Sequence, residues 1–195
     1  MWNDPFKLSN LMIPVWEKSR PRLHSTARLG TIEDAKKYLD EGDDINLMTK
    51  HEPYAPLHDA VYEHRLAMVK LLVERKANIH LKTIGGSDTA LGLAANSSLP
   101  KSTEATMYLL DQRADVNDTN AYGMTALMYA VNCCNHRNVQ LLLERKADPR
   151  MIDKDGMTAI SFTLHSYTFQ TKPEWQPIQD TIEKTIKLDL SCQDF

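Results

Sequence analysis

Two histidines offer the first side chains whose type could support chemistry. His24 and His58 each follow a leucine directly, in the segments RLHSTA and PLHDAV. An imidazole can act as a general base or bind a metal, but either use requires partner groups in a suitable arrangement. The chain contains no nucleophile elbow, no H-E-x-x-H and no spaced carboxylate pair in a recognisable pocket motif. We therefore expect both imidazoles to be buried, hydrogen bonded and structural.

A second candidate is the cluster of Cys133, Cys134 and His136, which contains residue types that bind zinc. It lacks C-x-x-C pairs and a clear fourth ligand, so we expect no metal there. Gly85 and Gly86 form the only glycine pair, and no Gly-Lys-Ser/Thr follows to make a phosphate loop. We expect neither a cofactor nor catalysis. Scattered Ser, His and Asp side chains could still converge in space, which a single sequence does not decide.

The composition is that of a soluble, folded protein. Of the 195 residues, 42% are hydrophobic and 25% are charged. No apolar run approaches the roughly 18 residues of a membrane helix, and the segment LMIPVW is too short for a signal peptide and is interrupted by Pro14. A net charge of -3 and a pI near 6.2 disfavour nucleic acid as a partner.

Three cysteines, two of them adjacent, give no disulfide framework, so a reducing compartment fits best. The expected location is cytoplasmic. The alternatives are the nucleus and, for a secreted effector, the cytosol of a host cell.

The elements that must position these residues form an internal repeat. Four ten-residue segments are near copies of one another, at successive offsets of 34, 37 and 33 residues: KYLDEGDDIN (37–46), LLVERKANIH (71–80), YLLDQRADVN (108–117) and LLLERKADPR (141–150). Apolar residues three and four apart predict that each copy ends a helix with one buried stripe. A second recurring element lies upstream and starts a short apolar helix, at Arg22, Pro56, Thr89, Thr125 and Thr158.

The polar loops between these units contain their own signals. Gly123 and Gly156 are 33 residues apart and stand where a tight turn needs a positive φ. The threonine two residues later can cap the next helix through its hydroxyl. This pattern resembles the ankyrin repeat family, whose unit of about 33 residues joins a Gly-x-Thr-Pro-Leu-His helix start to a Leu-Leu-x-x-Gly-Ala-Asp helix end. The resemblance implies an all-α solenoid of stacked helix-turn-helix units with hairpin-like loops, and a family histidine that ties neighbouring loops together.

The resemblance covers residues 21–190 and predicts five units. Their expected limits are 21–46, 47–80, 81–117, 118–149 and 150–190, with insertions confined to turns, such as SSLPKS (97–102). We interpret residues 1–20 as a capping segment over the first unit, with a partner-binding peptide as the alternative. Residues 191–195 form a tail. Ile178, Ile182, Ile186 and Leu190 define one helix face, which we expect to pack on the fourth unit rather than to dock another protein.

One departure from the family pattern affects the predicted stability. The glycine at the end of the second helix is kept only as Gly42 and is replaced by Lys76, Arg113 and Lys146. A side chain in a left-handed conformation costs about 1 kcal/mol per site. We therefore expect moderate stability.

In a stacked array, the loop tips and the exposed side of the first helices form one concave surface, where ankyrin-like proteins usually hold partners. The candidate partner-binding residues are Tyr54, Asp59, Tyr62, Asp88, Tyr122, Met124, Tyr129, Asn132, Met157, Phe162 and His165. Aromatic and methionine side chains gather in the fourth and fifth units, as at interface centres, although Tyr129 and Phe162 could instead fill space between units. The first three units offer Glu52, Asp59, Glu63 and Asp88, an acidic half that could receive a basic segment.

The sequence therefore predicts a monomeric, non-catalytic module that binds another protein. Two alternatives remain open. One is a regulatory or targeting subunit of an enzyme complex. The other is a pathogen effector that imitates host ankyrin proteins.

Overall fold

A computed structural model describes residues 21–49, 51–164 and 176–191. Within these residues the chain forms ten helices and only isolated β-bridges, so the predicted all-α class is confirmed. The proposed capping segment 1–20, His165 and residues 192–195 lie outside the described residues, whereas Ser191 ends the last helix instead of beginning a tail.

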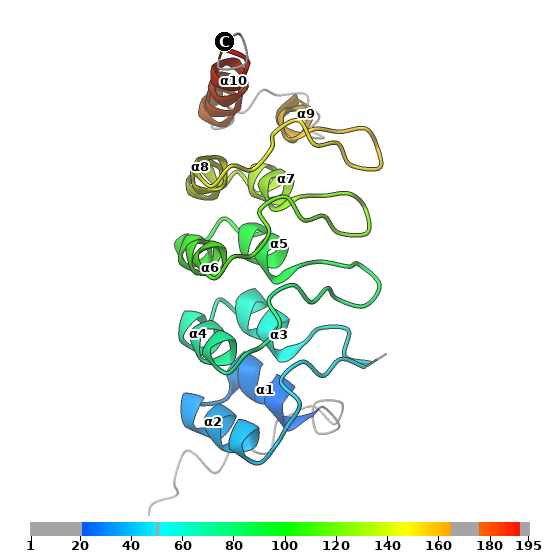
Figure 1. Ribbon diagram of the computed structural model, residues 1–195, viewed down its shortest axis with the longest axis vertical. Helices are drawn as coiled ribbons and strands as arrows, with labels where there is room; N and C mark the ends of the chain where they lie inside the picture. The colour runs from blue at the N-terminus through cyan, green and yellow to red at the C-terminus, as the bar shows by residue number, and fades with distance from the viewer. Residues whose placement is uncertain (1–20, 50, 165–175, 192–195) are drawn as a thin grey trace, which may run out of the picture.

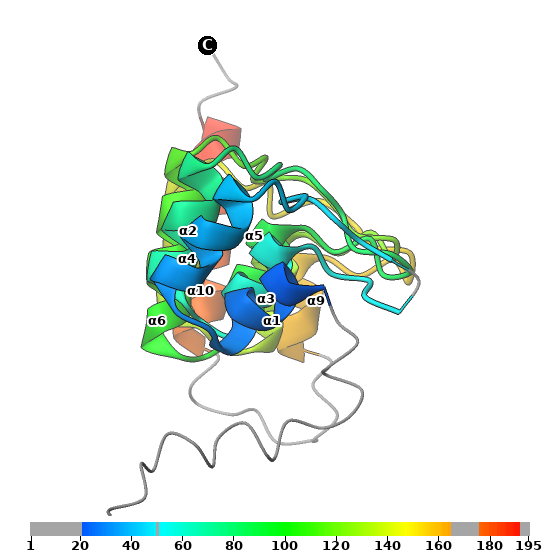
Figure 2. The ribbon, with the colours of Figure 1, turned by 90° about the horizontal axis from the view of Figure 1, so that it is seen from below.

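The helices stack in pairs along one column (Figure 1). The inner helices are α1 (Arg22–Leu29), α3 (Pro56–Tyr62), α5 (Ala90–Ala95), α7 (Ala126–Asn132) and α9 (Ala159–Leu164). The outer helices are α2 (Ile32–Asp40), α4 (Leu66–Glu74), α6 (Pro100–Asp111), α8 (His136–Glu144) and α10 (Gln176–Ser191). Figure 2, seen from below, places the two layers side by side, with the hairpin-like loops projecting beyond the inner helices.

Threonine hydroxyls start three of the inner helices, as the sequence predicts. Thr89 Oγ1 accepts the Gly92 N–H at 3.0 Å, and Thr125 Oγ1 accepts the Met128 N–H at 3.3 Å. Thr158 Oγ1 accepts the Ser161 N–H at 3.3 Å. Each bond satisfies one of the backbone donors that a helix leaves unpaired at its first turn.

The core runs continuously between the two layers. Each of the first four inner helices contributes at least one alanine that is 0% exposed, including Ala27, Ala60, Ala94 and Ala130. Because alanine is small, neighbouring inner helices can approach closely. The outer helices bury leucines behind them, including Leu72, Leu109 and Leu142, each 0% exposed. No unit could bury these surfaces alone, so the stack as a whole provides the stability.

The last outer helix closes the column as predicted. Helix α10 packs against α8 and α9, and Ile178 and Ile182 are 1% and 0% exposed. Ile186 is partly buried against the same core. Ile178, Ile182 and Ile186 are therefore core and not a docking face, whereas the side chain of Leu190, the fourth residue of the predicted stripe, lies outside what the structure describes. Asp180, Lys184 and Lys187 are exposed on the same helix.

One insertion lies differently from its prediction. We expect SSLPKS (97–102) to form a turn between helices, but α6 begins at Pro100 and has 12 residues, against nine in α4 and α8. Proline suits the first position of a helix because its missing N–H would be unpaired there anyway. Ser102 is fully buried, and its hydroxyl donates to the Leu99 carbonyl at 2.7 Å. Half of the insertion therefore lengthens the helix.

The predicted left-handed positions are confirmed. Gly42 has a φ of 95°, and the three residues that replace the family glycine have φ values of 71° (Lys76), 68° (Arg113) and 68° (Lys146). We expect Lys76→Gly, Arg113→Gly and Lys146→Gly each to raise the free energy of unfolding by up to about 1 kcal/mol, because glycine adopts this conformation without a steric penalty. Urea denaturation followed by circular dichroism measures the change.

A matched control is Lys36→Gly, because Lys36 is an exposed lysine inside helix α2. There glycine should lower the free energy of unfolding by about 1 kcal/mol. If glycine at Lys76, Arg113 and Lys146 also lowered the free energy of unfolding, the interactions of these three side chains would stabilise the fold by more than their left-handed backbone destabilises it.

Candidate protein-binding surface

Backbone hydrogen bonds join the successive hairpin-like loops into one ladder. The bonds run from the N–H of one loop to the carbonyl of the preceding loop: Ile84 to Pro53 (2.9 Å), Ala121 to Gly86 (3.0 Å) and Lys154 to Tyr122 (2.9 Å). Because each loop is held by its neighbour, the loop side chains project from a fixed backbone.

One loop position recurs in each of the last four units. We call the four residues that directly precede the N-caps of α3, α5, α7 and α9 the pre-cap row: Tyr54, Asp88, Met124 and Met157. All four are half-buried. Only one of them, Asp88, is charged.

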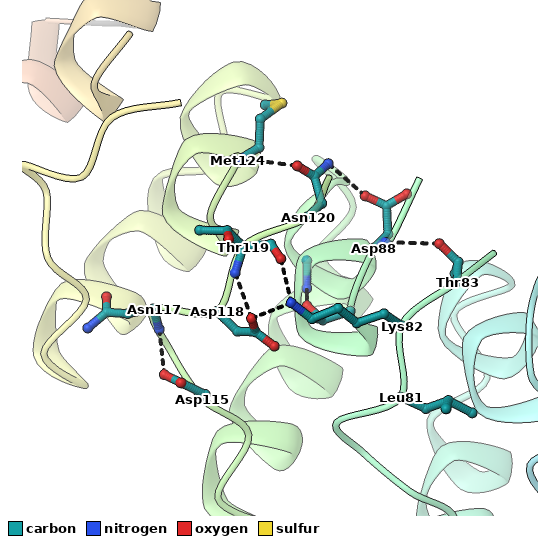
Figure 3. A network of polar contacts seen from close by, with 12 residues as sticks. Leu81, Lys82, Thr83, Asp88, Asp115, Asn117, Asp118, Thr119, Asn120 and Met124 are labelled. Atoms are coloured by element: carbon teal, nitrogen blue, oxygen red, sulfur yellow. Dashed lines mark hydrogen bonds and ion pairs between the residues drawn. The ribbon is translucent and has the colours of Figure 1, made fainter. Parts of the chain in front are cut away.

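Asp88 is held by two neutral donors from the next unit. Its Oδ1 accepts the Tyr129 hydroxyl at 2.7 Å and the Asn120 amide at 2.9 Å. The Asn120 side-chain oxygen in turn accepts the backbone N–H groups of Tyr122 (2.8 Å) and Met124 (3.0 Å). Figure 3 shows Asn120 between Asp88 and Met124. Burial, and then the hydrogen bond to Asp88, raise the pKa of Tyr129 well above its usual range.

A separate ion pair strengthens the same loop. Lys82 Nζ donates to Asp118 Oδ1 at 2.6 Å and to the Thr119 carbonyl at 2.7 Å (Figure 3). Lys82 thus forms a charge-assisted hydrogen bond with Asp118 and links its own loop to the next one.

Two exposed tyrosines lie at these loops and helices: Tyr122 in the loop before α7, and Tyr62 at the end of α3. Tyr62 is 60% exposed and Tyr122 is 61% exposed. Tyr54 stacks beside Tyr62, with ring centroids 6.4 Å apart and an interplanar angle of 22°. Exposed tyrosines are typical of protein interfaces, since they bury a large area at little entropic cost.

The remaining predicted residues differ in exposure. Asn132 is exposed at the end of α7, whereas Met157 and Phe162 are half-buried. Tyr129 and Phe162 are partly buried against the core. Each side chain therefore fills space between units, which is the alternative to partner binding, and keeps a part that is exposed. Among the predicted residues, the structure joins Tyr54 to Tyr62 by ring stacking and Asp88 to Tyr129 by a hydrogen bond.

The predicted acidic half is wrong as an open surface. Asp59 is only 4% exposed, and its Oδ2 lies 2.8 Å from His24 Nδ1. Glu52 is 7% exposed, and Glu63 pairs with Arg28 at 3.3 Å. The physical reason is that α1 packs directly against α3, so carboxylates on α3 meet side chains of the preceding unit. Asp88 remains as the only half-exposed carboxylate of this group without a cationic partner in residues 21–49, 51–164 and 176–191.

The histidines are buried and structural, as predicted. His58 accepts the Ala55 N–H through Nδ1 at 3.1 Å, and its Nε2 lies 3.0 Å from the Leu81 carbonyl, to which it donates. This second bond joins α3 to the following loop. Burial lowers the pKa of His58. His24 is 0% exposed but uses Nδ1 toward Asp59, and its Nε2 has no hydrogen-bond partner among the residues that the structure describes.

The cysteine cluster shows no arrangement of a metal site. Cys133 is half-buried, its thiol donates to Asn96 Oδ1 at 3.1 Å, and burial raises its pKa. In the part of the chain that the structure describes, no three His, Cys, Asp or Glu side chains are grouped so that they could hold a metal ion.

Sequence reasoning misses two residues that organise the surface. Asn120 fixes the loop that presents Tyr122, and Asp153 does the same one unit later, accepting the Met157 N–H at 2.8 Å. An Asn three residues before Gly123 and an Asp three residues before Gly156 are the signal that could have revealed them. Arg65 donates to the carbonyls of Thr26 (2.7 Å), Ala27 (3.1 Å) and Gly30 at the end of α1, and no local pattern indicates that contact.

Comparison with known proteins agrees with this architecture. A family model described as ankyrin repeats in three copies matches residues 23–119 and 57–153, which together make up more than half of the chain. The chain belongs to the ankyrin repeat family, and ankyrin repeats are in general protein–protein interaction modules.

Individual relatives extend the match. The chain is 34% identical over 161 residues to ankyrin repeat and SOCS box protein 6 of Homo sapiens and of Pongo abelii, covering 78% of this chain and 38% of each relative. It is 29% identical over 159 residues to the transient receptor potential cation channel subfamily A member 1 of Homo sapiens, covering 80% of this chain and 13% of that protein. The chain therefore spans well under half the length of these relatives. In its described residues no helix is long and apolar enough to cross a membrane.

Proposed function

We propose that this protein is a non-catalytic module that binds one partner protein across the loop ladder and the exposed side of the inner helices, and that it does so as a monomer. The observation that carries the proposal is a pair of exposed tyrosines: Tyr122 lies in a loop that a backbone hydrogen bond ties to the next loop, and Tyr62 ends helix α3. A fixed frame lowers the entropy lost on binding, and tyrosine supplies contact area.

The surrounding side chains support a polypeptide ligand rather than a small molecule. Tyr54, Met124 and Met157 are half-buried in the pre-cap row of the second, fourth and fifth units, so they offer apolar contacts on both sides of Asp88 in the third unit. A row of this kind suits an extended or helical segment, which can contact one unit after another.

The test removes the two exposed aromatic rings. We expect Tyr62→Ala combined with Tyr122→Ala to weaken partner binding about 100-fold, because each ring is expected to contribute roughly 1 to 2 kcal/mol. Tagged wild-type and variant chains, purified from cells and analysed by mass spectrometry, identify the partner. Titration with that purified partner then gives the affinities.

The matched control is Met107→Ala, which removes a side chain that is 45% exposed on the outer helix α6. This variant should retain every partner. Both variants should melt near the wild-type temperature, since none of the three side chains is buried. If the double tyrosine variant recovers the same partner with unchanged affinity, the proposed surface is wrong.

A further inference from the structure

The pre-cap row contains one charge that the fold does not neutralise. All hydrogen bonds that the Asp88 carboxylate receives come from the uncharged Tyr129 and Asn120, and both end on Oδ1. In the described residues neither an Arg, a Lys nor a His forms an ion pair with it. The nearest lysine of the same loop, Lys82, is paired with Asp118 instead.

The second carboxylate oxygen, Oδ2, makes no hydrogen bond to any residue that the structure describes. It lies on the side of Gly86, where an added Cβ atom would be 2.9 Å from it, so any residue other than glycine would crowd this oxygen. Oδ2 is therefore an acceptor that the described residues leave unused.

The surroundings make this charge costly to leave unpaired. Asp88 is half-buried, and its row neighbours are Tyr54 and Met124. A carboxylate that has lost part of its water gains most from a charged donor that covers it completely.

We infer that the partner's binding segment carries an arginine that pairs with Asp88, flanked on both sides by apolar residues that lie against Tyr54 and Met124. This inference rests on the proposed function, because it concerns the same surface. The side chains of the row favour arginine over lysine. A planar guanidinium can bond to a carboxylate and stack on an aromatic ring, and Tyr54, the neighbour of Asp88 in the pre-cap row, is aromatic.

A random peptide library displayed on phage and selected on the immobilised full chain tests this inference. Peptides are kept when they bind the wild type and fail to bind the chain with Tyr62→Ala and Tyr122→Ala. We expect the kept peptides to share one arginine between apolar residues. Their affinities are measured by fluorescence anisotropy, with the synthetic peptides as probes.

Asp88→Asn is the decisive variant, since the asparagine oxygen can still accept from Tyr129 and Asn120. It should weaken the kept peptides about 10- to 100-fold, the usual effect of losing a hydrogen bond between charged groups. Asp111→Asn is the matched control: Asp111 is an exposed aspartate on the outer helix α6, paired with Arg145, and its loss should leave affinity unchanged. If Asp88→Asn does not fold, replacing the peptide arginine by glutamine on the wild-type chain gives the same comparison.

The two proposals fail in different ways. Kept peptides that lack a basic residue, or that bind Asp88→Asn as tightly as the wild type, overturn the arginine inference and leave the surface assignment intact. A selection that yields no peptide sensitive to Tyr62 and Tyr122 contradicts the proposed function and the inference together.

Discussion

Replacing Gly123 by alanine should lower the free energy of unfolding by about 3 kcal/mol. Gly123 has a φ of 80°, a conformation that costs an alanine about 1 kcal/mol. A Cβ atom there would also lie 3.0 Å from the Asp153 Cα and 3.2 Å from the Lys154 N of the next loop. Because these are backbone atoms, they cannot rotate away, and overpacking of this kind adds roughly 1 to 3 kcal/mol. Equilibrium urea denaturation measures the sum.

Gly156→Ala separates the two contributions. Gly156 occupies the equivalent place one unit later, with a φ of 76°, but no atom of the described part of the chain lies within 4 Å of the added Cβ. This substitution should cost only the conformational part, about 1 kcal/mol. Equal losses for Gly123→Ala and Gly156→Ala would mean that close packing between successive loops contributes nothing to stability.

The Lys154 N–H gives a second measurement of the same contact. It donates to the Tyr122 carbonyl at 2.9 Å, one bond of the loop ladder. We expect its amide to exchange with solvent faster in Gly123→Ala than in Gly156→Ala, because only the first substitution pushes the two loops apart.

The periodic parts of the fold could be predicted from the sequence, since they depend on local chemistry. Thr89 and Thr125 cap helices through their own backbone neighbours, and Gly123 turns the chain wherever the loop lies. The stripe of Ile178 and Ile182 has one apolar face that must be buried in any packing. Each of these residues acts within a few positions of itself, so the sequence alone indicates its role.

The polar contacts between units could not be predicted in the same way. Asp59 and Tyr129 occupy equivalent positions, four residues after the N-cap, yet one carboxylate is buried against α1 and one hydroxyl reaches Asp88. The difference depends on which residue the preceding unit presents, 35 or 41 positions away. The spacing of the repeats indicates which residues lie on the surface, but it does not indicate which of their side chains form hydrogen bonds or ion pairs with the neighbouring unit.

The pairing of Asp59 leads to the second large effect. Asp59→Ala should lower the free energy of unfolding by about 3 kcal/mol, because it removes the one hydrogen bond that the fully buried His24 ring makes to the described residues and leaves that ring unsatisfied. The loss should concern the contact between α1 and α3. Urea denaturation gives its size, and hydrogen exchange of the α1 amides shows whether the first unit opens first.

Glu63→Ala is the matched control, because Glu63 and Arg28 also join α3 to α1 across 35 residues, but at 3.3 Å and with side chains 31% and 25% exposed. A pair so accessible to water contributes at most about 1 kcal/mol. The two variants together separate burial from charge: both remove one carboxylate from the same helix, and only Asp59→Ala strands a buried imidazole. Similar losses in the two variants would contradict the role assigned to His24. If Asp59→Ala lowered the affinity for the partner while the first unit stayed folded, Asp59 would belong to the binding surface after all.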